Sequence, residues 1–185
     1  MANPIPPASP EMAEKLAVNR AGRLTADQRR TVLLAAGVAL IMLLCPVTLL
    51  LQMGYVVLTG SFPVLTVAGI MFTIIGVLFI ALFLALILSN LQSFLPDAFG
   101  KHPVRYARGP LEIHHSERNR PELPFSYIIG DYSFAPFVVP DDVPMLPGAP
   151  YLVYYAAHSR ILLSLVALDA PDAKQWEPTF DPPKE

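Results

Sequence analysis

The chain has 185 residues, a hydrophobic fraction of 54% and a formal net charge of −2. Residues 97–185 carry eight basic and twelve acidic side chains, which argues against nucleic acid as a partner because nucleic acid favours a basic face. The only cysteine, Cys45, lies in an apolar stretch, so an intramolecular disulfide and a cysteine-based metal site are excluded.

Residues 1–25 predict a flexible, basic N-terminal arm that contains one short helix. Ser9 is the expected N-cap of this helix and Gly22 its expected stop. Thr25 and Gln28 have the spacing of a capping box, so a second helix should begin just after Thr25. We interpret the basic residues of the arm as topology-setting charges rather than as a lipid anchor, because acidic residues are interleaved with them.

The stretch 31–96 contains no Asp, Glu, Lys or Arg over 66 residues. A charge at the centre of a spanning helix costs roughly 2.5–3.5 kcal/mol, so such a run is typical of membrane-embedded chain. A single helix of this length would exceed the hydrocarbon thickness about threefold. Turn residues at 59–63 divide it. We predict a two-helix transmembrane hairpin over residues 26–95, with spans of about 31–58 and 64–88.

Basic residues predict the orientation of this hairpin. They flank both spans, whereas the connecting loop carries no charge. Positive residues stay on the cytoplasmic side, which predicts a multi-pass protein of the cell membrane with both termini cytoplasmic. The basic residues concerned are Lys15, Arg20, Arg23, Arg29, Arg30, Lys101, Arg105 and Arg108.

Small residues predict where the two helices meet, because small faces allow close approach in lipid. Alanines four residues apart lie near the cytoplasmic end of each span: Ala35, Ala39, Ala81 and Ala85. The alternative is that alanine is simply common in such helices. A second small-residue face, formed by Gly69, Thr73 and Gly76, is available to another subunit.

Residues 104–170 predict a small cytoplasmic β domain of five short strands separated by Pro, Gly and Asp. Two hairpins are expected, with turns at 130–131 and 156–160. An SH3-like or OB-like barrel or sandwich fits this pattern. The fold class is therefore α+β: a transmembrane α-hairpin followed by a small all-β domain. The expected strands are 111–114, 126–129, 132–134, 151–155 and 161–166.

The last segment, 171–185, has four prolines, six charges and little apolar content, which predicts a disordered tail. Trp176 and Phe180 are its only aromatic residues. We interpret both as incidental; the alternative is that they anchor the tail in a partner groove or at the membrane interface.

A metal site is the first candidate for chemistry. His115 and Glu117 share a face of the expected strand and offer two ligands, and His102 or Asp131 would have to supply a third. Because zinc sites need three or four ligands, we interpret His115 and Glu117 as solvated residues at a strand end. The sequence predicts no cofactor.

Catalytic residues are not evident. Ser164 and His158 suggest a nucleophile and a base, but Ser164 lies in an apolar strand without the Gly-x-Ser-x-Gly elbow and should bond local backbone. Asp141 and Asp142 are adjacent carboxylates in a loop and are expected to be solvated. The sequence thus predicts a protein that is not an enzyme.

Three short stretches resemble uncharacterised bacterial two-span membrane proteins with a small C-terminal cytoplasmic β domain. They are Asn19-Arg20-Ala21-Gly22-Arg23-Leu24 with Gln28-Arg29-Arg30, then Leu146-Pro147-Gly148, then Tyr154-Tyr155-Ala156-Ala157-His158-Ser159-Arg160. The resemblance implies a layout and no particular activity.

Two functions fit these observations. The first is an integral membrane protein that presents its β domain as a binding or scaffolding module, as an accessory subunit of a membrane complex. Its partners would be the lipid bilayer and other membrane subunits or further copies of the chain, and not nucleic acid. The alternative is a membrane-anchored sensor of a small ligand or a metal, with His115 and Glu117 in the site.

Overall fold

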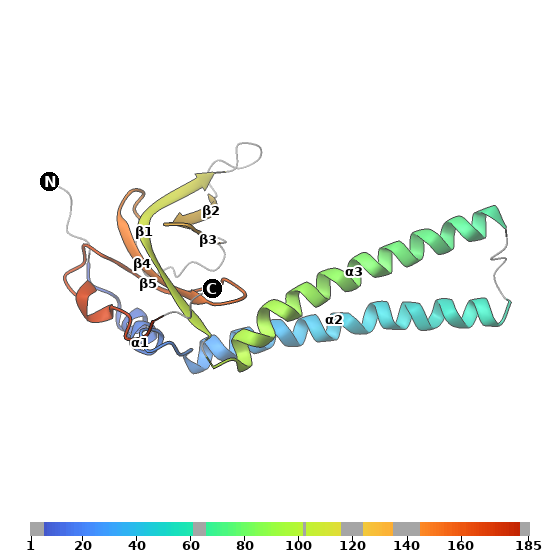
Figure 1. Ribbon diagram of the computed structural model, residues 1–185, viewed down its shortest axis with the longest axis horizontal. Helices are drawn as coiled ribbons and strands as arrows, with labels where there is room; N and C mark the ends of the chain where they lie inside the picture. The colour runs from blue at the N-terminus through green and yellow to red at the C-terminus, as the bar shows by residue number, and fades with distance from the viewer. Residues whose placement is uncertain (1–5, 61–65, 102, 116–123, 135–144, 182–185) are drawn as a thin grey trace. The chain divides into compact units, whose positions relative to one another are not determined.

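A computed structural model of the protein describes residues 6–60, 66–101, 103–115, 124–134 and 145–181 (Figure 1). The fold is α+β, with two long apolar helices and an antiparallel five-stranded open sheet.

The chain divides into two compact units. Residues 31–95 form the hairpin unit, and residues 1–30 together with 96–185 form the β unit. The N-terminal segment therefore belongs to the same unit as the strands, although the hairpin separates them in the sequence. Both ends of the hairpin helices, up to Arg30 and from Pro96, also belong to the β unit.

Helices α2 (Ala26–Leu58) and α3 (Val67–Phe99) have 33 residues each and are long and apolar enough to cross a membrane. The predicted capping box starts α2, since the Thr25 amide donates to Gln28 Oε1 (3.0 Å) and the Gln28 amide to Thr25 Oγ1 (3.2 Å). α3 continues well beyond the predicted end of the second span at residue 88. Its last turn thereby reaches into the β unit.

Within the hairpin unit, Ala39 of α2 packs against Ile87 and Leu91 of α3. The prediction for Ala39 is confirmed. The prediction for Ala81 and Ala85 is wrong, because both are exposed. The larger side chains of Ile87 and Leu91 fill the contact instead.

The second small-residue face also lies within the hairpin rather than open to another subunit. Gly69 is buried, and a Cβ built on Gly76 would lie 3.4 Å from Cε of Met53 in α2. Elsewhere the large apolar side chains of both helices are mostly exposed; Ile41 is 69% and Leu58 89% exposed.

The β unit contains the five predicted strands and both predicted hairpins. The sheet order is β3-β2-β1-β4-β5, and every pair is antiparallel. The strands are β1 (Val104–His115), β2 (Pro124–Ile129), β3 (Tyr132–Phe134), β4 (Pro150–Ala156) and β5 (Leu162–Ala167).

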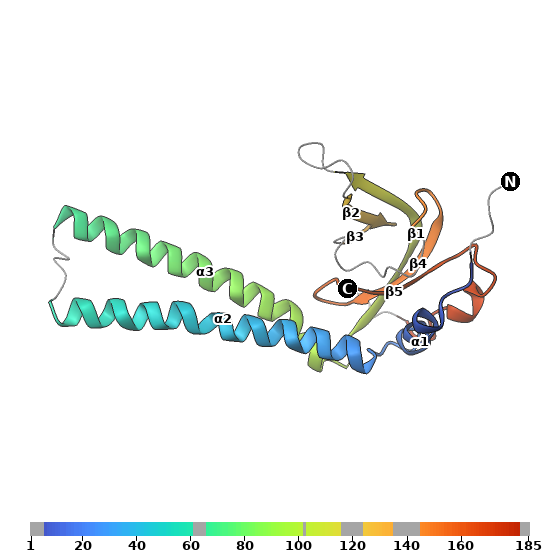
Figure 2. The same ribbon diagram turned by 180° about the vertical axis from the view of Figure 1, so that it is seen from behind.

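Strand β1 belongs to two ladders. Val104 to Pro110 pair with β4, and Leu111 to His115 pair with β2. At the changeover a Cβ built on Gly109 would lie 2.4 Å from the Gly130 backbone nitrogen, so only glycine fits there. In both ribbon views β1 runs past β4 and β5 at one end and past β2 and β3 at the other (Figures 1 and 2).

Aromatic rings connect strands that are not neighbours in the sheet. The Tyr155 ring of β4 lies 5.0 Å from the Tyr132 ring and 5.5 Å from the Phe134 ring, both from β3. Two strands separate β3 from β4 in the sheet order, so the sheet must curl for these rings to meet.

The N-terminal helix α1 (Pro10–Asn19) covers the other side of the strands. Ser9 caps it as predicted, with Ser9 Oγ accepting from the Met12 amide (3.2 Å). Met12 and Leu16, four residues apart on one face, are fully buried in the core that contains β5. The structure here differs from the expected flexible arm, because this helical face completes the core of the β unit.

The segment after β5 also differs from the expected disordered tail over the part that the structure describes. Trp176, at the end of η2 (Ala173–Trp176), is only 8% exposed, and its indole N–H donates to Asp172 Oδ2 (2.8 Å). The Tyr154 hydroxyl donates to the Trp176 carbonyl (2.6 Å). Phe180 packs edge to face on Tyr106. Both tail aromatics are therefore core residues, and in Figures 1 and 2 this segment lies beside α1.

Candidate functional site

A network of side-chain amides joins α1, the first turn of α2 and β5. Asn19 Nδ2 donates to Gln28 Oε1 (2.8 Å), and Gln28 Nε2 donates to Asn19 Oδ1 (3.1 Å). Gln28 Nε2 also donates to the Leu163 carbonyl (3.0 Å), and the Ser164 hydroxyl donates to Asn19 Oδ1 (2.7 Å). Asn19 and Ser164 are fully buried, so these bonds replace the water that both side chains lose on folding.

Asp97 makes the corresponding contact from the last turn of α3. Its Oδ1 accepts from the His158 amide (3.0 Å), and its Oδ2 accepts from the Ser159 amide (2.7 Å). His158 Nδ1 lies 3.1 Å from the same Oδ1. The carboxylate is 1% exposed and holds the β4–β5 turn through charge-assisted hydrogen bonds.

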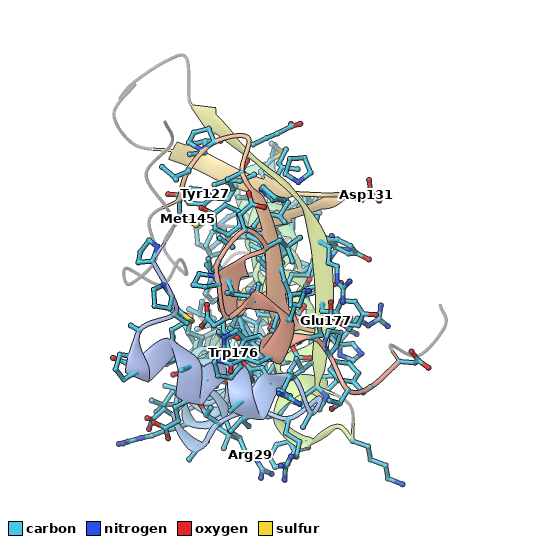
Figure 3. All side chains as sticks on the ribbon, turned by 90° about the vertical axis from the view of Figure 1, so that its left-hand side faces the viewer. Arg29, Tyr127, Asp131, Met145, Trp176 and Glu177 are labelled. Atoms are coloured by element: carbon cyan, nitrogen blue, oxygen red, sulfur yellow. The ribbon has the colours of Figure 1, made fainter. Side chains whose placement is uncertain are left out.

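A cavity of about 220 Å³ lies among the segments next to the Asn19–Gln28 amide network and the Asp97 hydrogen bonds. It is entirely within the β unit, and its lining includes Arg23, Leu24, Arg29, Asp97, Gly100 and Lys101. We call it the cationic cavity, because three of these residues are cations. In Figure 3 Arg29 lies at the lower end of the β unit and Asp131 at its upper right edge.

The electrostatics of the cationic cavity are unbalanced. Among the residues that the structure describes, Arg23, Arg29 and Lys101 form no ion pair, whereas both oxygens of the one lining carboxylate, Asp97, already accept hydrogen bonds. Such an arrangement attracts an anion.

A second cavity, of about 170 Å³, lies within the hairpin unit and is almost wholly apolar. Its polar lining residues are Gln52 and Thr73, and the Thr73 hydroxyl already donates to the Gly69 carbonyl (2.8 Å). This cavity can hold an apolar group and offers little chemistry.

The sequence-predicted metal ligands cannot be placed together. Glu117 and His102 lie outside the described residues, and the side chain of His115 is not described. Asp131 is exposed at the β2–β3 turn. Within the described ranges, no group of three His, Cys, Asp or Glu is arranged to hold a metal ion. The interpretation of His115 and Glu117 as solvated residues at a strand end therefore stays a prediction, and the metal site stays its alternative.

The residues weighed for catalysis have separate partners. Ser164 bonds Asn19, which corrects the expectation that its hydroxyl satisfies local backbone, and His158 bonds Asp97. Asp141 and Asp142 lie outside the described residues.

Sequence reasoning missed the residues that build this region: Asn19, Gln28 as a tertiary contact, and Asp97. One pattern could have identified Asp97, since it is the first charge after 66 uncharged residues. It lies inside α3, whose end was predicted too early from the sequence. Asn19 offered no such pattern, because its role depends on Ser164 of β5, which follows 145 residues later in the chain.

The chain was compared with known proteins in three ways. No protein-family model matches it, no curated protein resembles it, and no solved structure matches it. The function proposed below therefore rests on the chain's own residues.

Proposed function

We propose that this is a two-span protein of the cell membrane that presents its β unit on the cytoplasmic side as a binding or scaffolding module. The observation that carries the proposal is the apolar surface of α2 and α3, where side chains such as Ile41 and Leu58 are mostly exposed. Each buried Leu or Ile gains about 1.5–3 kcal/mol over an exposed one, so water is an unfavourable surrounding for this unit. A bilayer supplies the missing apolar environment.

The hydrogen bonds at the two helix ends support a shared side for the termini. Gln28 binds the first turn of α2 to β5, and Asp97 binds the last turn of α3 to the β4–β5 turn. If both helices cross, their ends in the β unit face the same compartment. The flanking basic residues then assign that compartment to the cytoplasm.

The β unit is proposed as a curled, partly open barrel of the SH3-like or OB-like kind. The contact of Tyr155 with Tyr132 and Phe134 supports the curl, since it brings β3 toward β4. Closure would require the two edge strands, β3 and β5, to pair. Barrels of this kind serve widely as binding modules, which fits a scaffolding role.

The proposed partners are the bilayer and other membrane subunits or further copies of the chain. The described contact between the helices centres on Ala39, Ile87 and Leu91, which leaves wide apolar faces on both. The stretch from Thr31 to Leu95 contains no Asp, Glu, Lys, Arg or His, whereas proton and ion pathways rely on such groups. An accessory or scaffolding role therefore fits better than transport.

The accessory-subunit role can be tested by purifying the tagged full chain from its source membranes in mild detergent and measuring the mass of the intact particle. We expect an assembly heavier than one chain that dissociates in a harsher detergent. A particle with the mass of a single chain would contradict this role.

A further inference from the structure

We propose that the cationic cavity binds a phosphate group, and that this phosphate belongs to the headgroup of an anionic phospholipid. The lipid source rests on the proposed membrane insertion, whereas the phosphate site rests on the cavity itself. The inference gives a ligand-binding role to basic residues that we interpreted from the sequence only as topology-setting charges.

The charges that face the cavity favour a phosphate. Arginine presents a planar fork that matches phosphate oxygens, and lysine adds a compact point charge. Arg23 and Arg29 supply two such forks and Lys101 the point charge, from the segments on both sides of the hairpin. The opposing carboxylate of Asp97 is directed to the amides of the β4–β5 turn.

The size and the remaining lining fit an amphipathic ligand. A cavity of about 220 Å³ holds several waters at about 30 Å³ each, which leaves room for a phosphate ester. The apolar residues Leu24, Ala98 and Pro103 line it together with the cations. A lipid offers both parts, a charged headgroup and an apolar glycerol-acyl region.

The sequence positions put the cations at headgroup depth if the hairpin spans the membrane. Arg29 precedes the uncharged stretch that begins at Thr31, and Lys101 follows the stretch that ends at Pro96. Basic pockets next to membrane helices on the cytoplasmic side bind anionic lipid headgroups, because their cations lie at the depth of the headgroups.

A matched pair of double variants of the full chain tests the site. Arg29→Gln with Lys101→Gln removes two cavity cations. Arg30→Gln with Lys174→Gln removes two exposed cations that do not line it, one of them the neighbour of Arg29. Each protein is purified in mild detergent, stripped of lipid, and incubated with phosphatidylglycerol, phosphatidylcholine or inorganic phosphate. Bound ligand is then counted by native mass spectrometry.

We expect the unaltered chain and the Arg30/Lys174 variant to retain phosphatidylglycerol in preference to phosphatidylcholine. The cavity variant should bind phosphatidylglycerol at least about tenfold more weakly, since each basic residue near a headgroup contributes about fivefold or more. Binding of inorganic phosphate that is lost only in the cavity variant, with no preference for phosphatidylglycerol over phosphatidylcholine, would support the phosphate site but contradict the lipid source. Equal loss in both variants, or in neither, would overturn the proposal.

Membrane insertion is scored separately, by separating the soluble and membrane fractions of the same cells before detergent is added. If the chain does not insert, all three proteins will be in the soluble fraction. If only the lipid site is wrong, all three will be in the membrane fraction and will bind the lipids alike. The two failures are therefore distinguishable.

Discussion

The side-chain amides of Asn19 and Gln28 face each other and exchange two hydrogen bonds, of 2.8 and 3.1 Å. Asn19 ends α1, and Gln28 lies in the first turn of α2. Both side chains also bond β5, through the Ser164 hydroxyl and the Leu163 carbonyl. One amide pair thus connects the start of the first apolar helix to the core of the β unit.

Asn19→Leu should destabilise the β unit, because it leaves the buried Ser164 hydroxyl without its partner and removes two of the hydrogen bonds of the Gln28 amide. The expected cost is about 1–3 kcal/mol, the penalty for an unsatisfied buried polar group. Thermal unfolding of the full chain in detergent measures it. Gln175→Leu, at an exposed amide, is the control and should change stability by less than about 0.5 kcal/mol. Equal effects of the two changes would contradict a structural role for the pair.

Asp97→Asn should loosen the β4–β5 turn. The amide side chain keeps one acceptor, loses the charge and turns an N–H toward one of the two backbone donors. Hydrogen bonds to charged groups contribute about 1.5–3 kcal/mol, so the His158 and Ser159 amides should exchange hydrogen markedly faster. Hydrogen exchange read by mass spectrometry reports this. Asp131→Asn, at the exposed β2–β3 turn, should leave the exchange of those two amides unchanged.

Fluorescence of Trp176, the only tryptophan, reports whether the C-terminal segment is docked. We expect blue-shifted emission and weak quenching by acrylamide, since the indole is buried. Tyr154→Phe removes the hydrogen bond to the Trp176 carbonyl at a cost of about 1 kcal/mol and should shift the emission toward the red. Emission typical of a solvated indole in the unaltered chain would contradict docking.

Alkaline pH should destabilise the β unit through Tyr154 and Tyr155. Burial is the main cause that raises the pKa of both phenols, and a hydrogen bond with Tyr132 raises the pKa of Tyr155 further. A phenol whose folded-state pKa lies above its unfolded-state pKa of about 10 contributes to the stability of the fold. This contribution is fully present below about pH 10 and is lost as the pH rises through the folded-state pKa.

The measurement for these tyrosines is phenolate absorbance just above pH 10. Unfolding in a denaturing detergent at that pH should increase it, because buried neutral phenols are released and ionise. The double variant Tyr154→Phe with Tyr155→Phe should show a smaller increase. An unchanged absorbance on unfolding of the parent chain would show that both phenols already ionise in the fold.

Local patterns predicted most elements of this fold. The capping box placed the start of α2, Ser9 marked α1, and short apolar runs between Pro, Gly and Asp located the strands, although β1 begins at Val104 rather than at the predicted residue 111. These patterns are set by neighbours within a few residues, so one sequence reveals them.

The tertiary contacts were beyond such patterns. From the sequence, Met12 and Trp176 each belong to a polar terminal segment, yet both complete one core because α1 and η2 both pack against β5. The cationic cavity likewise combines residues from both sides of a 66-residue apolar stretch, and no local spacing links Arg29 to Lys101.

The central claim is that α2 and α3 cross the membrane with the β unit in the cytoplasm. Single cysteines placed by Thr59→Cys and by Asp131→Cys, each in a Cys45→Ser background, can be probed with a membrane-impermeant maleimide. We predict that the cysteine at position 59 is labelled in intact cells, and the one at position 131 only after permeabilisation. Labelling at 131 in intact cells, or protection at 59 until permeabilisation, would contradict the account.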